Sequence, residues 1–199
     1  NTFLTKNISH AEYNRIIKDN GAIVLTSNGI FTANLIVSNS KYFKYKWIWE
    51  KSKATNFLNA KKQPLRKYEE PYSKGIRKNQ LTGSYGDFQP VLVESNGDRY
   101  PTDIIYFKTA ESEGEVFHPT QKPVELGRYL IRTYTNPGEV VLDNTCGSGS
   151  FLVAAVLEGR NFIGIEKDEE SVRFKNEEIN YVDVSKKRII QAYNNLDEK

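Results

Sequence analysis

The chain has 199 residues, an apolar fraction of 38% and a formal net charge of +3. Its length suits one α/β domain with a buried core and is short for two domains. We expect neither a transmembrane helix nor a signal peptide, because the chain lacks apolar runs of the lengths that these need. A single cysteine, Cys146, excludes an internal disulfide framework and fits a reducing compartment. With only two histidines besides, it also argues against a zinc site of the His/Cys kind.

The charge is unevenly distributed. Residues 41–78 contain twelve basic and three acidic side chains, so this stretch carries +9 and the rest of the chain −6. A basic stretch suits a polyanionic partner, because neutralised phosphates release their condensed counterions. A solvated, lysine-rich loop fits the same composition equally well.

The first half of the chain predicts alternating helices and strands. Ser-His-Ala-Glu at residues 9–12 is a capping box that opens a short helix, and Gly21 stops it. The sequence then predicts, in chain order, a buried strand at 22–26, a helix at 31–38 and a second strand at 45–49. Residues 51–95 are predicted to form loops, with a short hairpin near 89–93.

The second half continues the alternation. Pro123 suits the first turn of a helix with Leu126, Leu130, Ile131 and Tyr134 on one face. The next predicted elements are a strand at 140–143, a tight loop at 144–149, a helix at 150–157, a strand at 161–166 and two charged helices up to the end. This order predicts an α/β fold with a mainly parallel sheet and helices on both faces.

Residues 140–151 carry the clearest chemical signal. They read as a strand ending in Asp143, a turn with Gly147 and Gly149, and the start of a helix. Two glycines one residue apart let the backbone approach a ligand closely, and the free N–H groups of the helix point into the same space. Glu166 ends the next predicted strand, where a carboxylate can accept both hydroxyls of a ribose.

The identity of the nucleotide follows from what the loop lacks. A dinucleotide fingerprint wants a third glycine where Leu152 stands, and a P-loop wants a Gly-Lys-Ser/Thr that does not follow. Asp143 at the head of the loop suits a cationic or amino-bearing ligand better than a pyrophosphate. S-adenosylmethionine, with its ammonium and sulfonium charges, therefore fits better than NAD.

Residues 118–126, His-Pro-Thr-Gln-Lys-Pro-Val-Glu-Leu, place polar side chains before the helix that leads to the strand ending in Asp143. In a parallel sheet this loop returns to the ligand side. Alone, such a run is more typical of ordinary chemistry at a helix start, and His118 alone is more typical of a hydrogen-bonded scaffold residue than of a catalytic base.

Taken together, residues 117–169 resemble the amino-methyltransferases of DNA. The resemblance lies in the segment at 118–126, in Leu-Asp-Asn-Thr-Cys-Gly-Ser-Gly-Ser at 142–150 and in Gly-Ile-Glu at 164–166, and it continues more loosely over 13–62. The order of the segments is similar to that of the permuted (beta) group, whose catalytic half precedes its cofactor half. It implies a Rossmann-like class I methyltransferase fold and an S-adenosylmethionine-dependent enzyme that methylates the exocyclic amine of adenine (N6) or cytosine (N4). Only relative frequency favours adenine.

The resemblance also implies residue roles. In the family, the segment at 118–122 packs over the methionine end of the cofactor, the loop at 143–149 holds its amino acid part, and the acid after the next strand holds its ribose. The cofactor-binding residues implied are His118, Pro119, Thr120, Gln121, Lys122, Asp143, Asn144, Thr145, Cys146, Gly147, Ser148, Gly149, Glu166 and Lys167.

Two positions depart from related enzymes. Asn144-Thr145 replaces a frequent Pro-Phe, which we expect to alter packing near the adenosine. Carbon-5 cytosine methyltransferases resemble this fold and attack the base with a cysteine that follows a proline. Cys146 follows Thr145 inside the cofactor loop, so we do not expect it to be a nucleophile.

The family's catalytic motif, Asp/Asn-Pro-Pro-Tyr, does not occur in the sequence, so the catalytic residues are unknown. Family order places it just before residue 1, and the nearest internal candidate, Glu-Glu-Pro-Tyr at 69–72, lacks the Asp/Asn-Pro start. We expect two segments, one before Asn1 and one near Glu70, to belong to the molecule in addition to this sequence. An intact mass of 22.8 kDa would contradict that expectation.

Residues 51–62 mix basic, amide and aromatic side chains, which can neutralise phosphates and contact bases or fill the gap left by a flipped base. The candidate DNA-binding residues are Lys51, Lys53, Asn56, Phe57, Lys61, Lys62, Lys74, Arg77 and Lys78. Within one methyltransferase domain, we assign 1–70 to the rest of the catalytic half, 71–117 to target recognition and 118–199 to the cofactor half.

Two other functions stay open: an NAD-dependent dehydrogenase, disfavoured by Leu152, and an inactive remnant that binds cofactor or DNA. The resemblance implies double-stranded DNA as partner and a cytoplasmic protein encoded by a bacterium or phage. It leaves open whether the protein is a homodimer and whether a restriction enzyme accompanies it.

Overall fold

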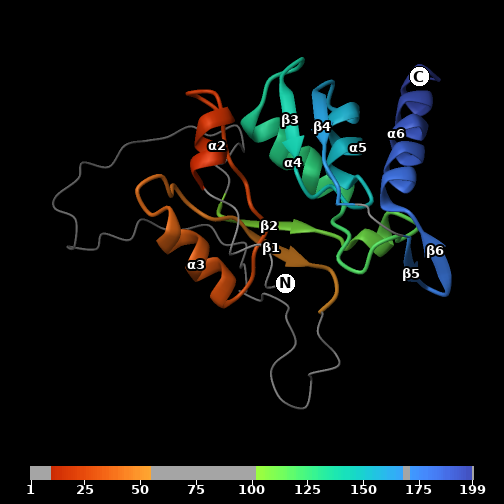
Figure 1. Ribbon diagram of the computed structural model, residues 1–199, viewed down its shortest axis with the longest axis horizontal. Helices are drawn as coiled ribbons and strands as arrows, with labels where there is room; N and C mark the ends of the chain where they lie inside the picture. The colour runs from red at the N-terminus through yellow and green to blue at the C-terminus, as the bar shows by residue number, and fades with distance from the viewer. Residues whose placement is uncertain (1–9, 55–101, 168–170, 199) are drawn as a thin grey trace, which may run out of the picture. The chain divides into compact units, whose positions relative to one another are not determined.

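A computed structural model describes residues 10–54, 102–167 and 171–198 of the chain (Figure 1). The chain divides into two compact units, one formed by residues 1–45 and 107–199 and the other by residues 46–106. Helices and parallel strands mix in the first unit, which is the α/β fold that the alternation of elements predicts.

The N-terminal part of the first unit contains two short helices. Helix α2 spans His10–Ile16, so it begins as predicted and ends several residues before the predicted stop at Gly21; helix α3 spans Ile30–Ser38, close to its predicted bounds. The strand predicted over residues 22–26 is wrong: this segment is irregular, and its apolar side chains are exposed. An apolar run becomes a strand only when a neighbouring backbone completes its hydrogen bonds. No described strand pairs with residues 22–26.

The second unit contains strand β1, Ile48–Lys51, paired with strand β2, Ile104–Phe107, whose last residue already belongs to the first unit. The Ile48 N–H donates to the Asp103 carbonyl over 2.7 Å, next to this pair. Strand β1 begins three residues later than predicted, and its Trp49 is half-buried. The hairpin predicted near residues 89–93 lies outside the described residues.

The first unit continues with four elements that follow the predicted order. They are helix α4, Val124–Tyr134, strand β3, Val140–Asp143, helix α5, Ser150–Leu157, and strand β4, Asn161–Gly164. Strands β3 and β4 are parallel, with Asp143 opposite Gly164. Strand β4 ends earlier than predicted, so Glu166 follows two residues beyond it. The ends of both strands therefore lie at one edge of the pair.

The C-terminal region differs from the prediction of two helices. It forms an antiparallel hairpin of β5, Val172–Phe174, and β6, Glu177–Ile179, followed by the single helix α6, Tyr181–Asp197. The two turn residues, Lys175 and Asn176, have φ of 51° and 68°. A two-residue hairpin turn with positive φ at both positions matches the right-handed twist of the strands. The high charge of this region concealed a strand–turn–strand pattern.

Helix α5 forms the centre of the core. It is apolar on every face, which suits a helix enclosed by other elements, and α4, α6, β3 and β4 all contact it (Figure 1). Ala154 and Ala155 are completely buried and pack with Ile131 of α4. Val153 packs with Ala192 of α6. This packing holds the beginning of α5 in a fixed place between α4 and α6.

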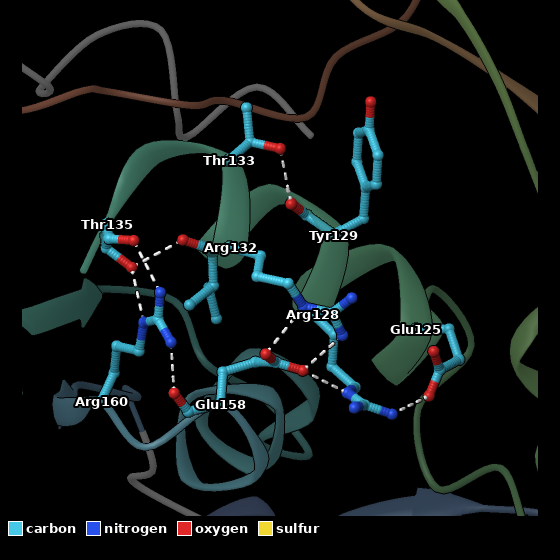
Figure 2. Close-up of polar contacts among 9 residues, drawn as sticks. Glu125, Arg128, Tyr129, Arg132, Thr133, Thr135, Glu158 and Arg160 are labelled. Carbon is cyan, nitrogen blue, oxygen red and sulfur yellow. Dashed lines mark hydrogen bonds and ion pairs between the residues drawn. The ribbon is translucent and has the colours of Figure 1, made fainter. Parts of the chain in front are cut away.

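Figure 2 shows the polar contacts between α4 and the end of α5. Glu158, whose side chain is 9% exposed, accepts from Arg128 Nε at 2.6 Å and from Arg132 Nε at 2.8 Å. The hydrogen bond from Arg132, followed by that from Arg128, lowers the pKa of Glu158 to about 2. Beside it the buried Arg160 donates to the Thr135 hydroxyl at 3.0 Å. These contacts tie the end of α4 to the turn that leads into β4.

Within the described part of the chain, no helix has both the length and the apolar content that a membrane crossing demands.

Candidate functional site

The site is built around the loop at residues 144–149, which leaves β3 and enters α5. Gly147 and Gly149 have φ of 50° and 77°, a region that side chains with a Cβ rarely adopt. The Cys146 N–H donates to the Ile165 carbonyl at 3.0 Å, which fastens the loop to the segment after β4. A Cβ on Gly149 would lie 2.7 Å from the Cβ of Ser185 in α6. The loop therefore needs glycine at 149 for two reasons, its backbone conformation and the approach of α6.

Two carboxylates follow the neighbouring parallel strands and meet at this loop. The Gly147 N–H donates to Glu166 Oε2 at 2.6 Å, and the Thr145 N–H donates to Asp143 Oδ1 at 3.2 Å. Burial raises the pKa of Asp143; the Thr145 hydrogen bond opposes this rise and the charge of Glu166 adds to it. Two half-buried carboxylates side by side favour a cation or a donor of several hydrogen bonds between them.

The segment before α4 lies next to the glycine loop. The nearest atom to a Cβ built on Gly147 is Cδ2 of His118, at 3.8 Å. The Thr120 N–H donates to His118 Nδ1 at 3.0 Å, so the proton of the neutral ring is on Nε2. Burial lowers the pKa of His118; Glu166 raises it and Lys122 lowers it further. The ring is therefore neutral at physiological pH, and it packs on Tyr181 with 4.7 Å between centroids.

A hydrogen bond connects the two predicted binding segments directly. The Ser148 hydroxyl donates to Gln121 Oε1 at 2.9 Å, and the Phe117 N–H donates to the same oxygen at 3.1 Å. Lys122 Nζ donates to the Thr120 carbonyl at 2.8 Å and so closes the segment on itself. The local fold thus brings the residues predicted at 118–122 against those predicted at 143–149.

The remaining predicted cofactor residues lie at the margins of this arrangement. Pro119 and Thr145 are exposed, and Lys167 is exposed directly after Glu166. Asn144 Nδ2 donates to the Tyr13 hydroxyl of α2 at 3.0 Å, so the residue that replaces the frequent proline contacts the N-terminal helix. Burial raises the pKa of Cys146 to about 11. Its thiol is therefore protonated at neutral pH.

Helix α6 contributes side chains to the site that sequence reasoning missed. Tyr181 packs against His118 with the two rings tilted by 54°, Ser185 packs on Gly149, and Arg188 donates to the carbonyl of Ser148 at 2.6 Å. The spacing of four and three residues puts these side chains on one face of a helix. That periodicity is visible in the sequence, but nothing local indicates that this face meets the loop at 144–149.

Glu113 was also missed. Its carboxylate accepts from the N–H groups of Val124 and Glu125, at 2.6 and 3.0 Å, and so caps the first turn of α4. Ten residues separate this cap from the helix it serves, which places it beyond the reach of a local capping pattern.

The predicted DNA-binding residues are only partly described. Lys51 ends β1 with its Nζ 5.2 Å from the centre of the Trp49 ring, and Lys53 is exposed after it. The other predicted DNA contacts fall outside the described residues: Asn56, Phe57, Lys61, Lys62, Lys74, Arg77 and Lys78. Among the described residues, no three His, Cys, Asp or Glu side chains gather where they could hold a metal ion.

Several known proteins are similar to this chain. The type II methyltransferase M2.MboI of Moraxella bovis is 29% identical over 165 residues, which cover 80% of this chain and 59% of that protein. M.HinfI of Haemophilus influenzae is 27% identical over 191 residues, covering 89% and 48%. The DNA adenine methyltransferase YhdJ of Escherichia coli (strain K12) is 45% identical over 56 residues, covering 28% and 19%. The chain thus spans roughly half the length of the two relatives that it matches over most of its own length.

A solved structure has a similar fold. The crystal structure of the M1.HpyAVI–SAM complex matches with a TM-score of 0.60 and 23% identity, over 90% of this chain and 79% of that one. This likeness shows a class I methyltransferase fold. The sequence profile of the DNA methylase family matches residues 5–177, most of the chain. Since the profile includes the glycine loop, both carboxylates and the segment before α4, the chain belongs to the DNA methylase family.

Proposed function

We propose that the protein transfers a methyl group from S-adenosylmethionine to the N6 amine of adenine in DNA. The observation that carries the proposal is the convergence of two carboxylates, a glycine loop and the segment at 118–122 at one edge of a parallel strand pair. Membership of the DNA methylase family supports the reaction class. The adenine specificity named for YhdJ and the SAM named for M1.HpyAVI support the base and the cofactor.

The donors and acceptors of the site fit this cofactor. S-adenosylmethionine carries an ammonium and a sulfonium charge, which the carboxylate of Asp143 attracts. Its ribose offers two hydroxyls, and Glu166 can accept from them, because a carboxylate accepts more hydrogen bonds than the one from Gly147. Gly147 has no Cβ, and the nearest atom to a Cβ built there is His118 Cδ2 at 3.8 Å, so a ligand can approach the loop backbone closely at this residue. When bound, the cofactor supplies an activated methyl group.

The residues of this chain bind the cofactor and orient it. Asp143 and Glu166 hold the cofactor from the strand ends, while Ser148 and Gln121 keep the loop and the segment before α4 in register. His118 and Tyr181 form an aromatic wall beside them. Transfer to an exocyclic amine needs mainly alignment and exclusion of water. We assign no catalytic residue, because the sequence does not contain the family's catalytic motif.

DNA binding is proposed for the basic stretch of residues 41–78, with its net charge of +9. Phosphate contacts from lysine and arginine position a protein on a duplex without reading its sequence. We propose residues 71–117 as the segment that recognises the target sequence, from their place between the catalytic and cofactor halves.

Nucleoside analysis tests the proposal. The protein is incubated with S-adenosylmethionine and unmethylated DNA, and the digested DNA is examined by mass spectrometry. N6-methyladenine is expected. N4-methylcytosine would correct the base while keeping the reaction. Cofactor binding without any methylated base would mean that the protein is an inactive binding remnant and not an enzyme. Tight binding of NAD but not of S-adenosylmethionine would overturn the proposal.

A further inference from the structure

Arg188 of α6 contacts the place where the glycine loop becomes helix α5. Its Nη1 donates to the Ser148 carbonyl at 2.6 Å and lies 3.2 Å from the hydroxyls of both Ser148 and Ser150. Nη1 carries two hydrogens for these three oxygens, so at least one hydrogen is shared between two of them. The guanidinium also lies over the ring of Phe117, 5.9 Å from its centre. One side chain thus contacts the loop, the first residue of α5 and the segment before α4.

This contact sets the direction of a short chain of hydrogen bonds. Arginine can only donate, so the Ser148 hydroxyl accepts from Arg188 and must use its own hydrogen toward Gln121 Oε1. That oxygen also accepts from the Phe117 N–H. The Gln121 amide is therefore oriented by its own segment, through the Phe117 N–H and the Glu115 carbonyl, and also from α6, through Ser148. Arg188 lies in neither of the two segments expected to contact the cofactor.

Helix stability alone does not explain a cation in this place. The guanidinium of Arg188, a residue of α6, contacts the first residue of α5. At this end of α5 the helix dipole is positive, so a cation is unfavourable. Burial lowers the pKa of Arg188, against the opposing charge of Glu113. A half-buried cation at the positive end of a helix is unfavourable unless its hydrogen bonds compensate for the lost hydration and the repulsion. What they do here is hold the peptide between the two left-handed glycines.

We propose that Arg188 is a positioning residue for the cofactor: through Ser148 it holds the glycine loop and Gln121 in their binding arrangement. The inference rests on the proposed function, since it takes S-adenosylmethionine as the ligand. It adds a role for helix α6, whose side chains act on the site from behind the loop. Ser185, one turn earlier, packs on Gly149 and keeps α6 close enough for the contact.

The test measures two properties in matched variants: the affinity for the cofactor, and the protection of the loop amides from hydrogen exchange. Arg188→Ala is expected to weaken S-adenosylmethionine binding in calorimetry by about tenfold or more. It should also speed hydrogen exchange of the amides at 144–150 in the cofactor-free protein. Lys187→Ala removes the same charge from the neighbouring, exposed position of α6 and should change affinity by less than about twofold. Arg188→Lys keeps the charge and should recover part of both properties.

A double-mutant cycle separates positioning from general support of the fold. Ser148→Ala removes the hydroxyl contact with Arg188 and keeps the carbonyl contact. It should weaken binding, and the double variant should lose less affinity than the two single losses multiplied, because the hydroxyl contact is lost only once. The proposal would be overturned if the losses of affinity in the two single variants multiplied in the double variant. It would also be overturned if Arg188→Ala had the affinity and the loop exchange of the wild type. If Arg188→Ala does not fold, Arg188→Lys and Ser148→Ala decide by the same loop exchange. A wild-type protein that does not bind S-adenosylmethionine would reject the proposed function, while loop exchange would still decide the role of Arg188.

Discussion

At the scale of single residues, the site depends on two carboxylates with different tasks. Asp143 ends β3 and Glu166 follows β4, and each accepts a backbone N–H of the glycine loop. Because they are acceptors at the edge of a parallel pair, they can hold the loop and still offer negative charge to a ligand. The same pattern was visible in the sequence, since Asp143 is the last residue of one apolar strand and Glu166 comes two residues after the end of the next.

Replacing either acid should weaken the binding of S-adenosylmethionine. We expect Asp143→Ala and Glu166→Ala each to weaken affinity by at least about tenfold, roughly 1.4 kcal/mol, because each removes an acceptor from the ligand and from the loop. Asp197→Ala, at the exposed end of α6, serves as the control. Titration calorimetry measures all three, and unchanged affinity in both site variants would contradict the assignment.

The half-buried imidazole of His118 should make stability depend on pH. Burial holds the pKa of His118 below its ordinary value of 6.5, so the unfolded chain takes up a proton before the folded protein does. The stabilising effect is therefore complete above pH 6.5 and is lost as pH falls from 6.5 through the folded-state pKa. Denaturant unfolding at several pH values from about 8 to about 5 should show this loss in the wild type and not in His118→Gln. An NMR titration that places the pKa at or above 6.5 would contradict it.

At the scale of secondary-structure elements, the close approach of α6 to the loop can be tested through glycines. Gly149→Ala forces a side chain to φ 77° and brings its Cβ to 2.7 Å from that of Ser185. Gly138→Ala meets a similar φ of 80° with nothing within 4 Å. The conformational cost, about 1–2 kcal/mol, is common to both variants. Denaturant unfolding should therefore show a larger loss for Gly149→Ala, partly restored by adding Ser185→Gly. Equal losses would contradict the tight packing of α6.

The ion pairs between α4 and the end of α5 stabilise the fold rather than the site. Arg132 and Arg128 hold the pKa of Glu158 at about 2, below its ordinary value of 4.5. The contribution of Glu158 is therefore present above pH 4.5 and is lost as pH falls toward 2. Glu158→Gln should lower the melting temperature at pH 7 by roughly 2–4 °C. It should also make the decrease of melting temperature with falling pH less steep. Glu125→Gln, an exposed partner of Arg128, should have a smaller effect, and equal effects would contradict the account.

Element prediction succeeded where local pattern and tertiary surroundings agree. The bounds of α5 were predicted to the residue, because its apolar stretch is framed by a glycine turn on each side. Residues 22–26 have an equally apolar composition but no described strand beside them, so composition alone misled. The charge of residues 172–179 favours a helix, whereas the Lys175-Asn176 turn makes them a hairpin.

At the scale of the whole molecule, cofactor and DNA contacts are expected in different units. The glycine loop belongs to the unit of residues 1–45 and 107–199, while Lys51 and Lys53 belong to the unit of residues 46–106. On the proposed function, the first unit binds the cofactor, and the second contributes Lys51, which is half-exposed, and Lys53, which is exposed. Binding of cofactor and of DNA should therefore respond to separate sets of substitutions.

Salt dependence measures the second set. Lys51→Ala with Lys53→Ala should weaken DNA binding and lower the slope of log affinity against log salt by about 1 for each phosphate that is no longer neutralised. Lys186→Ala with Lys187→Ala removes the same charge from α6 and should leave that slope nearly unchanged. Fluorescence anisotropy at several salt concentrations gives both slopes, and an equal decrease in the two double variants would contradict the assignment of the basic stretch.

The sequence by itself determined the α/β alternation, the glycine loop with its two acids, and the resemblance to DNA amino-methyltransferases. Each of these is written in residues that are close together in the chain, where turn chemistry and hydrophobic period act locally. Only the tertiary structure decided that Arg188, Tyr181 and Ser185 reach the site, and that residues 22–26 form no described strand. Those outcomes depend on which backbone and side chains meet across long stretches of sequence, and local propensity carries no information about such meetings.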